Sequence, residues 1–170
     1  MVLLSVSDDK DKANLLNSFF ATCFNTSHPP LSVDSSNNRD SECPDELLCT
    51  SEEVEHLLLN LDESKASGPD GISATMLKCT AAIIASSVTA LFNLSIRSGQ
   101  VPNEWKESLV VPIPKSSEQA SPSGYRPISL LSILSKTLER HMHWVISAHL
   151  TENRILSDAQ WGSKTACDCW

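Results

Sequence analysis

The chain has 170 residues and a net charge of -8, with 41% hydrophobic and 5% aromatic residues. This length suits one globular domain, or one domain with a short additional segment. The acidic excess lies in the first third, because residues 1–61 hold 3 Lys or Arg against 11 Asp or Glu, whereas residues 62–170 hold 10 of each. This distribution argues against a nonspecific polyanion binder and leaves room for a local phosphate site.

The sequence leads us to expect neither a membrane span nor a secretory signal. There is no run of 18 uncharged apolar residues, and the opening MVLLSVSDDKDK turns acidic too early for a signal peptide. We therefore expect an intracellular protein, nuclear or cytoplasmic and not secreted, with no membrane partner.

The cysteines and histidines give no strong metal signal. The six cysteines lack the CxxC or Cys/His spacing of a structural zinc site, so we expect reduced thiols. Cys167 and Cys169 could hold a soft metal only with ligands from elsewhere, and the alternative is a frayed chain end. His141 and His143 lie two residues apart on an expected helix, which places their rings on different faces.

The first half of the chain predicts helices separated by a linker. Residues 8–26 carry apolar side chains at helical spacing, with acids in the first turn, and predict an amphipathic helix. Residues 28–49 have no period and read as an acidic linker. Thr50 and Glu53 form a capping box that predicts a short helix ending near Asp62.

Residues 64–73, SKASGPDGIS, predict a tight turn followed by a helix cap at Ser73. Two helices are expected next, ATMLKCTAAIIAS and SVTALFNLSIRSG, the second ending at Gly99. A last helix is expected over residues 132–150, with a buried stripe made of Leu134, Leu138, Met142 and Val145.

Residues 108–114 and 127–131 are the expected strands. Pro112 and Pro114 remove N–H donors from the same edge of the first strand, so that edge cannot be fully paired. The other edge can pair with the second strand. An edge hairpin over about residues 108–131 is therefore predicted.

Alternation along these strands places Lys115 and Arg126 on one face near the hairpin tip. Two cations side by side normally cost stability, so the pair makes more sense with an anion between them. Arg binds phosphate oxygens in a bidentate manner and Lys acts as a mobile charge, which suits a di- or triphosphate. The alternative is a solvated tip that binds nothing.

Four segments in order give a family resemblance: KASGPDGI at 65–72, LFNLSIRSGQVPNEWKESLVVPIPK at 91–115, YRPISLLSILSKTLER at 125–140 and LSDAQWG at 156–162. Together they resemble the reverse transcriptase, an RNA-directed DNA polymerase, of non-long-terminal-repeat retrotransposons. The resemblance covers about residues 50–162. The segment DDKDKANLLNSFFATCF resembles the helix that these polyproteins carry between endonuclease and polymerase.

The resemblance implies an α+β, mostly helical fold that corresponds to the fingers of a right-hand polymerase. It divides the chain into an N-terminal helix of the pre-polymerase region (1–27), the acidic linker (28–49), a partial reverse transcriptase domain (50–162) and a divergent tail (163–170). Its implied partners are an RNA template, a DNA primer and a deoxynucleotide triphosphate in the full-length family. No partner is assigned to the isolated chain.

The resemblance also implies roles for two groups of residues. Lys115 and Arg126 correspond to the fingers residues that clasp the triphosphate of the incoming nucleotide. The second group lies near the template strand and consists of Lys65, Gly68, Pro69, Asp70 and Gly71. For this group the alternative is a turn that caps a helix and needs no ligand, with Lys65 in water.

The family's metal-binding carboxylates come from a palm strand and from a Tyr-x-Asp-Asp turn, and neither motif occurs here, Tyr125 being the only tyrosine. We therefore assign no catalytic and no metal-binding residue, and expect Mg²⁺ or Mn²⁺ for the full-length polymerase alone. The isolated chain is not expected to synthesise DNA. The alternative function is a non-catalytic helical module, derived from a mobile element, that binds a protein partner.

Overall fold

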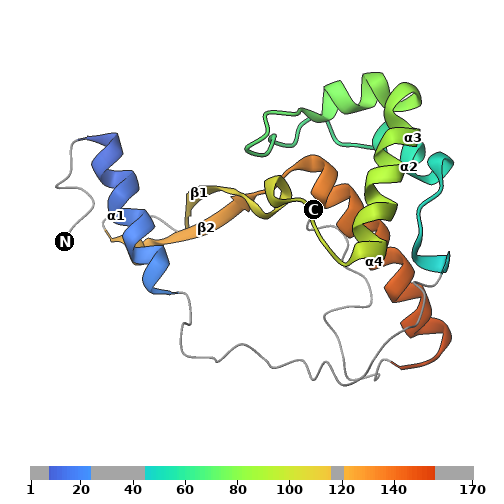
Figure 1. Cartoon of the computed structure of the whole chain (residues 1–170). Coiled ribbons are helices and arrows are strands. Elements are labelled where there is room, and N and C mark those ends of the chain that lie inside the picture. Colours follow the sequence, from blue (N-terminus) through green and yellow to red (C-terminus); the bar gives the residue numbers. More distant parts are fainter. Residues whose placement is uncertain (1–7, 24–44, 116–120, 156–170) are drawn as a thin grey trace. The chain divides into compact units, whose positions relative to one another are not determined.

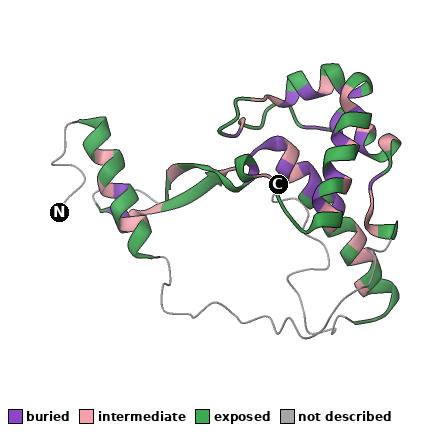
Figure 2. Ribbon diagram, viewed as in Figure 1, coloured by how far each residue is buried: buried purple, intermediate pink, exposed green. Residues whose placement is uncertain are grey.

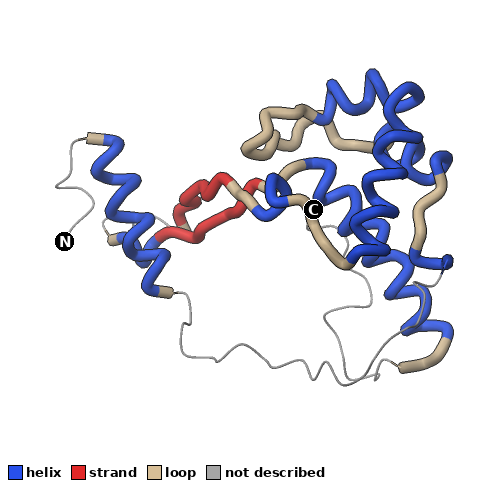
Figure 3. The backbone as a smooth tube through the Cα atoms, in the orientation of Figure 1, coloured by secondary structure: helices blue, strands red, loops and turns tan. Residues whose placement is uncertain are grey.

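A computed structural model describes residues 8–23, 45–115 and 121–155 (Figure 1). The chain forms two compact units, one from residues 1–40 with 109–130 and the other from residues 41–108 with 131–170. Figure 3 shows helices throughout the described residues and one two-stranded sheet, which confirms the α+β, mostly helical class. The elements in chain order are α1 (Asp9–Thr22), η2 (Asp45–Leu47), α2 (Ser51–Leu59), α3 (Ala74–Ser98), η3 (Asn103–Lys106), β1 (Leu109–Pro114), η4 (Pro122–Gly124), β2 (Tyr125–Leu130) and α4 (Ile133–Glu152).

The first unit combines α1 with the hairpin. The Asp8 carboxylate caps α1 by accepting from the Asp11 backbone N–H at 3.2 Å, and the helix packs against η4. Leu16 is the buried residue of α1, as an amphipathic helix requires. The end of the expected helix, residues 24–26, and most of the expected linker, residues 28–44, lie outside the described residues.

The core of the second unit lies between α2, α3 and α4 (Figure 2). Phe92 of α3 and Trp105 of η3 meet edge to face, with their ring centroids 5.7 Å apart. The capping box of α2 is confirmed, because the Glu53 backbone N–H donates to Thr50 Oγ1 and the Thr50 N–H donates to Glu53 Oε2. A short helix is thus fixed at its start by its own sequence and along its length by burial.

A single helix, α3, replaces the two helices expected over residues 74–99. The prediction of a break was wrong, because the helix continues through Ser86 and Ser87, and no Gly or Pro interrupts it before Gly99. Gly99 ends it in the left-handed conformation, with φ 64°. Among the described helices α3 is the one long and apolar enough to span a membrane by length and composition, and in this fold its buried face packs against α2.

The hairpin confirms the expected strand pairing. β1 and β2 are antiparallel, with Val111 opposite Ile128 and Pro112 opposite Pro127. The Lys115 backbone N–H donates to the Gly124 carbonyl at 2.8 Å, so the alternation of the ladder makes Pro112 and Pro127 a non-hydrogen-bonded pair. Proline therefore removes donors from both outer edges of the hairpin, whereas the sequence predicted such a loss for the edge of β1 alone.

Two residues, Leu131 and Ser132, separate β2 from α4, which runs to Glu152. Leu138 is buried in it as expected, and Leu134 and Met142 pack against the core. His141 is also buried, and its Nε2 lies 3.2 Å from the Leu47 carbonyl oxygen of η2. This histidine ties α4 to the segment that precedes α2, which gives it a structural role.

Candidate functional site

Lys115 follows the last residue of β1 and is held by two contacts at the hairpin tip. Its backbone N–H donates to the Gly124 carbonyl, and its ammonium Nζ donates to the Ser123 carbonyl at 2.9 Å. Ser123 belongs to η4, a short turn that Ser121 caps through its hydroxyl. The tip therefore presents the Lys115 charge next to a backbone carbonyl while the side chain stays exposed.

Arg126 lies on β2, directly opposite Ile113. Since Lys115 is two residues beyond Ile113, the pleat places Lys115 and Arg126 on the same face and diagonally across the ladder. This is the geometry that alternation predicted. The Arg126 side chain is exposed and makes no hydrogen bond or ion pair with the described residues.

The two cations lack a compensating acid in the part of the chain that the structure describes. The ion pairs there join Lys12 to Asp9 and Lys78 to Glu63. Two like charges on adjacent strands repel each other, and an anion that receives hydrogen bonds from both would relieve that repulsion. Binding of an oxyanion at the tip is what this arrangement predicts.

The second group of expected site residues forms a loop in the other compact unit. The Gly71 backbone N–H donates to the Gly68 carbonyl, which closes a turn with Pro69 and Asp70 at its centre. The Asp70 carboxylate accepts from the Ile72 N–H at 3.2 Å, and Gly71 has φ 68°. Pro, Asp and Gly therefore occupy positions that turn chemistry favours.

Gly68 is buried, and its position requires a residue that has no side chain. A Cβ added there would lie 2.6 Å from the Leu131 carbonyl carbon and oxygen and from the Ser132 nitrogen. The loop is thus seated directly against the start of α4, where Ser132 Oγ is buried without a partner among the described residues. Close backbone packing accounts for Gly68 without any ligand.

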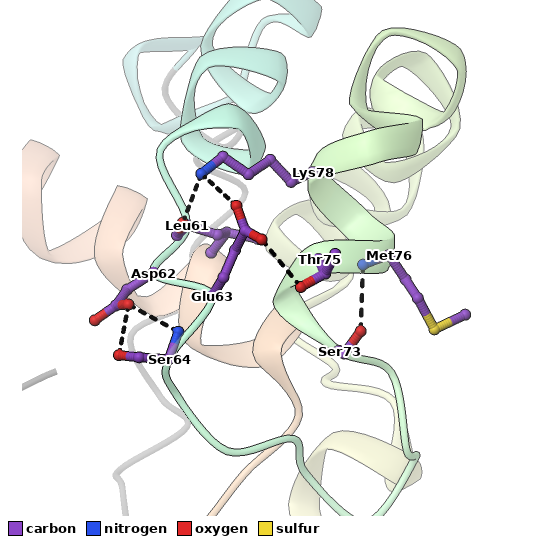
Figure 4. Close-up of polar contacts among 8 residues, drawn as sticks. All are labelled: Leu61, Asp62, Glu63, Ser64, Ser73, Thr75, Met76 and Lys78. Atoms are coloured by element: carbon purple, nitrogen blue, oxygen red, sulfur yellow. Dashed lines mark hydrogen bonds and ion pairs between the residues drawn. The ribbon is translucent and has the colours of Figure 1, made fainter.

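Glu63 anchors the loop to the first turns of α3 (Figure 4). Its carboxylate lies 3.0 Å from the Lys78 ammonium and accepts from the Thr75 hydroxyl at 3.2 Å. Lys78 also donates to the Leu61 carbonyl. The hydrogen bond and charge of Lys78 lower the pKa of Glu63 below its usual range.

A second carboxylate in the same close-up shapes the chain just before Lys65. Asp62 accepts from both the hydroxyl and the N–H of Ser64, at 2.7 and 2.9 Å. These bonds lower the pKa of Asp62. The side chain of Lys65 is exposed beyond this turn.

Lys115 and Arg126 share the hairpin, as expected, while residues 65–71 share one loop in the other unit. Sequence reasoning missed Glu63 and Lys78, the pair that holds this loop. Fifteen positions separate them, and no helical or strand period connects such a pair before the fold is known. The roles of all seven expected residues in binding stay predictions.

No protein-family model matches the chain. Several proteins with a printed description are nevertheless similar to it in sequence. Over 112 residues, 65% of the chain, it is 34% identical to the "Probable RNA-directed DNA polymerase from transposon BS" of Drosophila melanogaster. It is 31% identical over 111 residues to the "Probable RNA-directed DNA polymerase from transposon X-element" of the same species. A "Retrovirus-related Pol polyprotein from type-1 retrotransposable element R2" of Nasonia vitripennis is 30% identical over 95 residues.

These similarities support a partial reverse transcriptase of the non-long-terminal-repeat retrotransposon type, the family that the four sequence motifs predicted. The matched parts amount to 12%, 12% and 8% of the lengths of these three relatives, in the order named. The chain therefore corresponds to a small part of much longer proteins.

Proposed function

We propose that this chain is the nucleotide- and template-binding fingers portion of a retrotransposon RNA-directed DNA polymerase. The observation that carries the proposal is the placement of Lys115 and Arg126 on one face of the hairpin, without an acidic partner among the described residues. The similarity to RNA-directed DNA polymerases supports a nucleic-acid template and primer in general. A deoxynucleotide triphosphate as the ligand of the two cations, with an RNA template and a DNA primer, is part of the proposal.

The two cations have complementary chemistry for a triphosphate. The Arg126 guanidinium offers a planar fork that can donate two parallel hydrogen bonds to phosphate oxygens. The Lys115 ammonium exchanges its bond with the Ser123 carbonyl for a charged oxygen, which is a stronger acceptor. Held in place by the ladder, the pair would offset negative charge on the leaving pyrophosphate.

The chain by itself binds without catalysing. Metal ions in such polymerases activate the primer hydroxyl and support the leaving phosphate. The described residues hold no group of three His, Cys, Asp or Glu side chains placed to bind a metal ion, and the sequence contains no Tyr-x-Asp-Asp turn. We expect no template-dependent nucleotide incorporation by this chain in a primer-extension assay.

Isothermal titration with a deoxynucleotide triphosphate tests the binding step. We expect weak binding that a Lys115→Ala, Arg126→Ala double variant loses by at least about tenfold, since two charge-assisted contacts disappear. The matched control is Arg97→Ala with Lys106→Ala, which removes the same charge from the other unit. Equal affinity in the two double variants, or no binding by the unaltered chain, overturns the proposal.

A further inference from the structure

The first compact unit buries its side chains at the tip of the hairpin and leaves its strands open. Its buried residues, among those that the structure describes, are Leu16 of α1 and Pro122 of η4. On the strands, by contrast, Ile113 and Ile128 are each 45% exposed. A two-stranded hairpin is marginal without further cover, so this unit places its cover at the end that carries the two cations.

The helix α1 supplies this cover. It packs against η4, the turn that leads into β2 (Figure 1). Helical spacing sets Phe19 and Phe20 beside Leu16, and both rings are half-buried, whereas Ser18 on the opposite side of the helix is exposed. An apolar face of α1 therefore rests on the turn.

The same turn is connected to both cations of the hairpin. The Ser123 carbonyl accepts from the Lys115 ammonium at 2.9 Å, and the Gly124 carbonyl accepts from the Lys115 backbone N–H at 2.8 Å. On the other side, the Tyr125 N–H closes η4 by donating to the carbonyl of its first residue, and Arg126 follows directly in the chain. One turn thus sets the position of Lys115 through hydrogen bonds and that of Arg126 through the backbone.

The two cations gain from a turn that is held in place. Like charges on adjacent strands repel each other, and the long side chain of Lys115 has many rotamers. If η4 were loose, the charges would move apart, and an anion would have to restrain them again when it binds. A fixed turn removes part of that entropic cost before the ligand arrives.

We propose that α1 positions the nucleotide site: Leu16 docks on η4 and thereby holds Lys115 and Arg126 at a spacing that lets one triphosphate contact both. Leu16 is a positioning residue, because it is buried and acts through η4 without touching the ligand. The inference rests on the proposed function and deepens it. It gives a helix that lies far from the hairpin in the sequence a part in nucleotide binding.

Hydrogen exchange of the full chain without nucleotide, resolved by NMR, tests the support of the tip by α1. Leu16→Ala should quicken exchange of the Lys115 and Tyr125 amides at least about fivefold, because a cavity beneath α1 loosens η4. The Val88 amide of α3 should keep its rate, which shows that the second unit is intact. Ser18→Ala, on the exposed side of α1, is the matched control, and Leu16→Met should keep exchange slow because it fills a similar volume.

A titration with a deoxynucleotide triphosphate, followed by NMR chemical shifts, tests the effect on binding. Leu16→Ala should weaken the affinity about fivefold, while Ser18→Ala leaves it unchanged. In a Lys115→Ala background the same change at Leu16 should weaken the remaining affinity about twofold or less, because one of the two groups that α1 positions is gone. A purely structural role of Leu16 would give the same loss with and without Lys115.

The two proposals fail in different ways. If the unaltered chain binds the nucleotide but exchange at Lys115 does not respond to Leu16→Ala, the proposed function stands and α1 has no part in it. An equal loss of affinity with and without Lys115 likewise overturns the positioning role. If the unaltered chain binds no nucleotide, the proposed function falls and takes the binding role of α1 with it, while the exchange rates alone decide whether α1 holds the tip.

Discussion

Gly68 and Gly71 stand three residues apart in one turn and are required for different reasons. Gly68 is fixed by packing, because an added Cβ would meet the backbone of Leu131 and Ser132 at 2.6 Å. Gly71 is fixed by its conformation, since φ is 68° and open space surrounds the place of a Cβ. The distinction matters because only the first requirement ties this loop to α4.

We predict that Gly68→Ala lowers the free energy of unfolding by about 3 kcal/mol, since backbone atoms of α4 cannot move aside as a side chain could. Gly71→Ala should cost about 1 kcal/mol, which is the strain of a left-handed Ala. Urea unfolding of both variants measures the difference. Equal losses would mean that the start of α4 yields and that Gly68 has no special packing role.

The acid sensitivity of the same loop follows from Asp62 and Glu63. Hydrogen bonds from Ser64 and the partner Lys78 lower the pKa of these carboxylates in the folded protein. The unfolded chain therefore takes up protons first as the pH falls. The stabilisation is complete above about pH 5 and is lost as the pH falls through the lowered pKa values.

We predict that hydrogen exchange at Ser64 and Ile72 quickens below about pH 4, after correction for the intrinsic pH dependence. Glu63→Gln keeps the acceptor for Thr75 but removes the charge that holds Lys78, so the Ile72 amide should already exchange faster at neutral pH. An unchanged amide in this variant would show that the ion pair does not order the loop.

At the scale of elements, the segment before α2 is held by hydrogen bonds from a side chain whose role the sequence does not indicate. Asn93 on α3 accepts from the Cys49 backbone N–H at 2.8 Å and donates to the Cys49 carbonyl at 3.0 Å. The Cys49 thiol beside it is buried, and desolvation, with the charge of Glu53, raises its pKa to about 11. This thiol is therefore slow to react while Asn93 keeps the segment closed.

We predict that Asn93→Ala costs about 2 kcal/mol, because a partly buried N–H and carbonyl lose their partners together. Alkylation of Cys49, followed by mass spectrometry, should accelerate in this variant, whereas the exposed Cys79 reacts at its former rate. Asn60→Ala is a control, since Asn60 bonds to a carbonyl at the exposed end of α2. Faster alkylation of Cys79 as well would indicate general unfolding instead of local release.

The elements themselves could largely be read from the sequence where the signal is local. Local signals act on neighbouring residues, and three of the features that they predicted are confirmed. These are the capping box of Thr50 and Glu53, the helix end at Gly99 and the pairing of the proline-containing strand β1 with β2. The length of α3 could not be read, because Ser86 and Ser87 suit a boundary and an exposed helix face equally. Two contacts could not be predicted in this way, that of Glu63 with Lys78 and that of Asn93 with Cys49. Both depend on the packing of segments that are distant in the sequence, and helical or strand periodicity does not indicate such packing.

At the scale of the whole molecule, the two compact units differ in what they bury. The second unit contains nearly all the buried side chains among the described residues, including Val54, Leu58 and Phe92. The first unit buries Leu16 and Pro122, while Leu109, Val110, Ile113 and Ile128 of the hairpin each remain 45% exposed or more. Two-stranded hairpins are marginal without a substantial core, so the cations of the proposed nucleotide site stand on the weaker unit.

We predict that the hairpin opens before the helical unit does. Backbone amides of Ile113 and Ile128 should exchange at least about a hundred times faster than those of Val88 and Phe92, because local opening exposes few apolar contacts. A deoxynucleotide triphosphate that bridges Lys115 and Arg126 should slow exchange in the hairpin and leave α3 unchanged, since a ligand stabilises the state that it binds. Hydrogen exchange resolved by NMR, repeated on the Lys115→Ala, Arg126→Ala variant, measures both effects. Uniform protection across the two units would show that they unfold together, and slowing that persists in the double variant would place the nucleotide away from the hairpin tip.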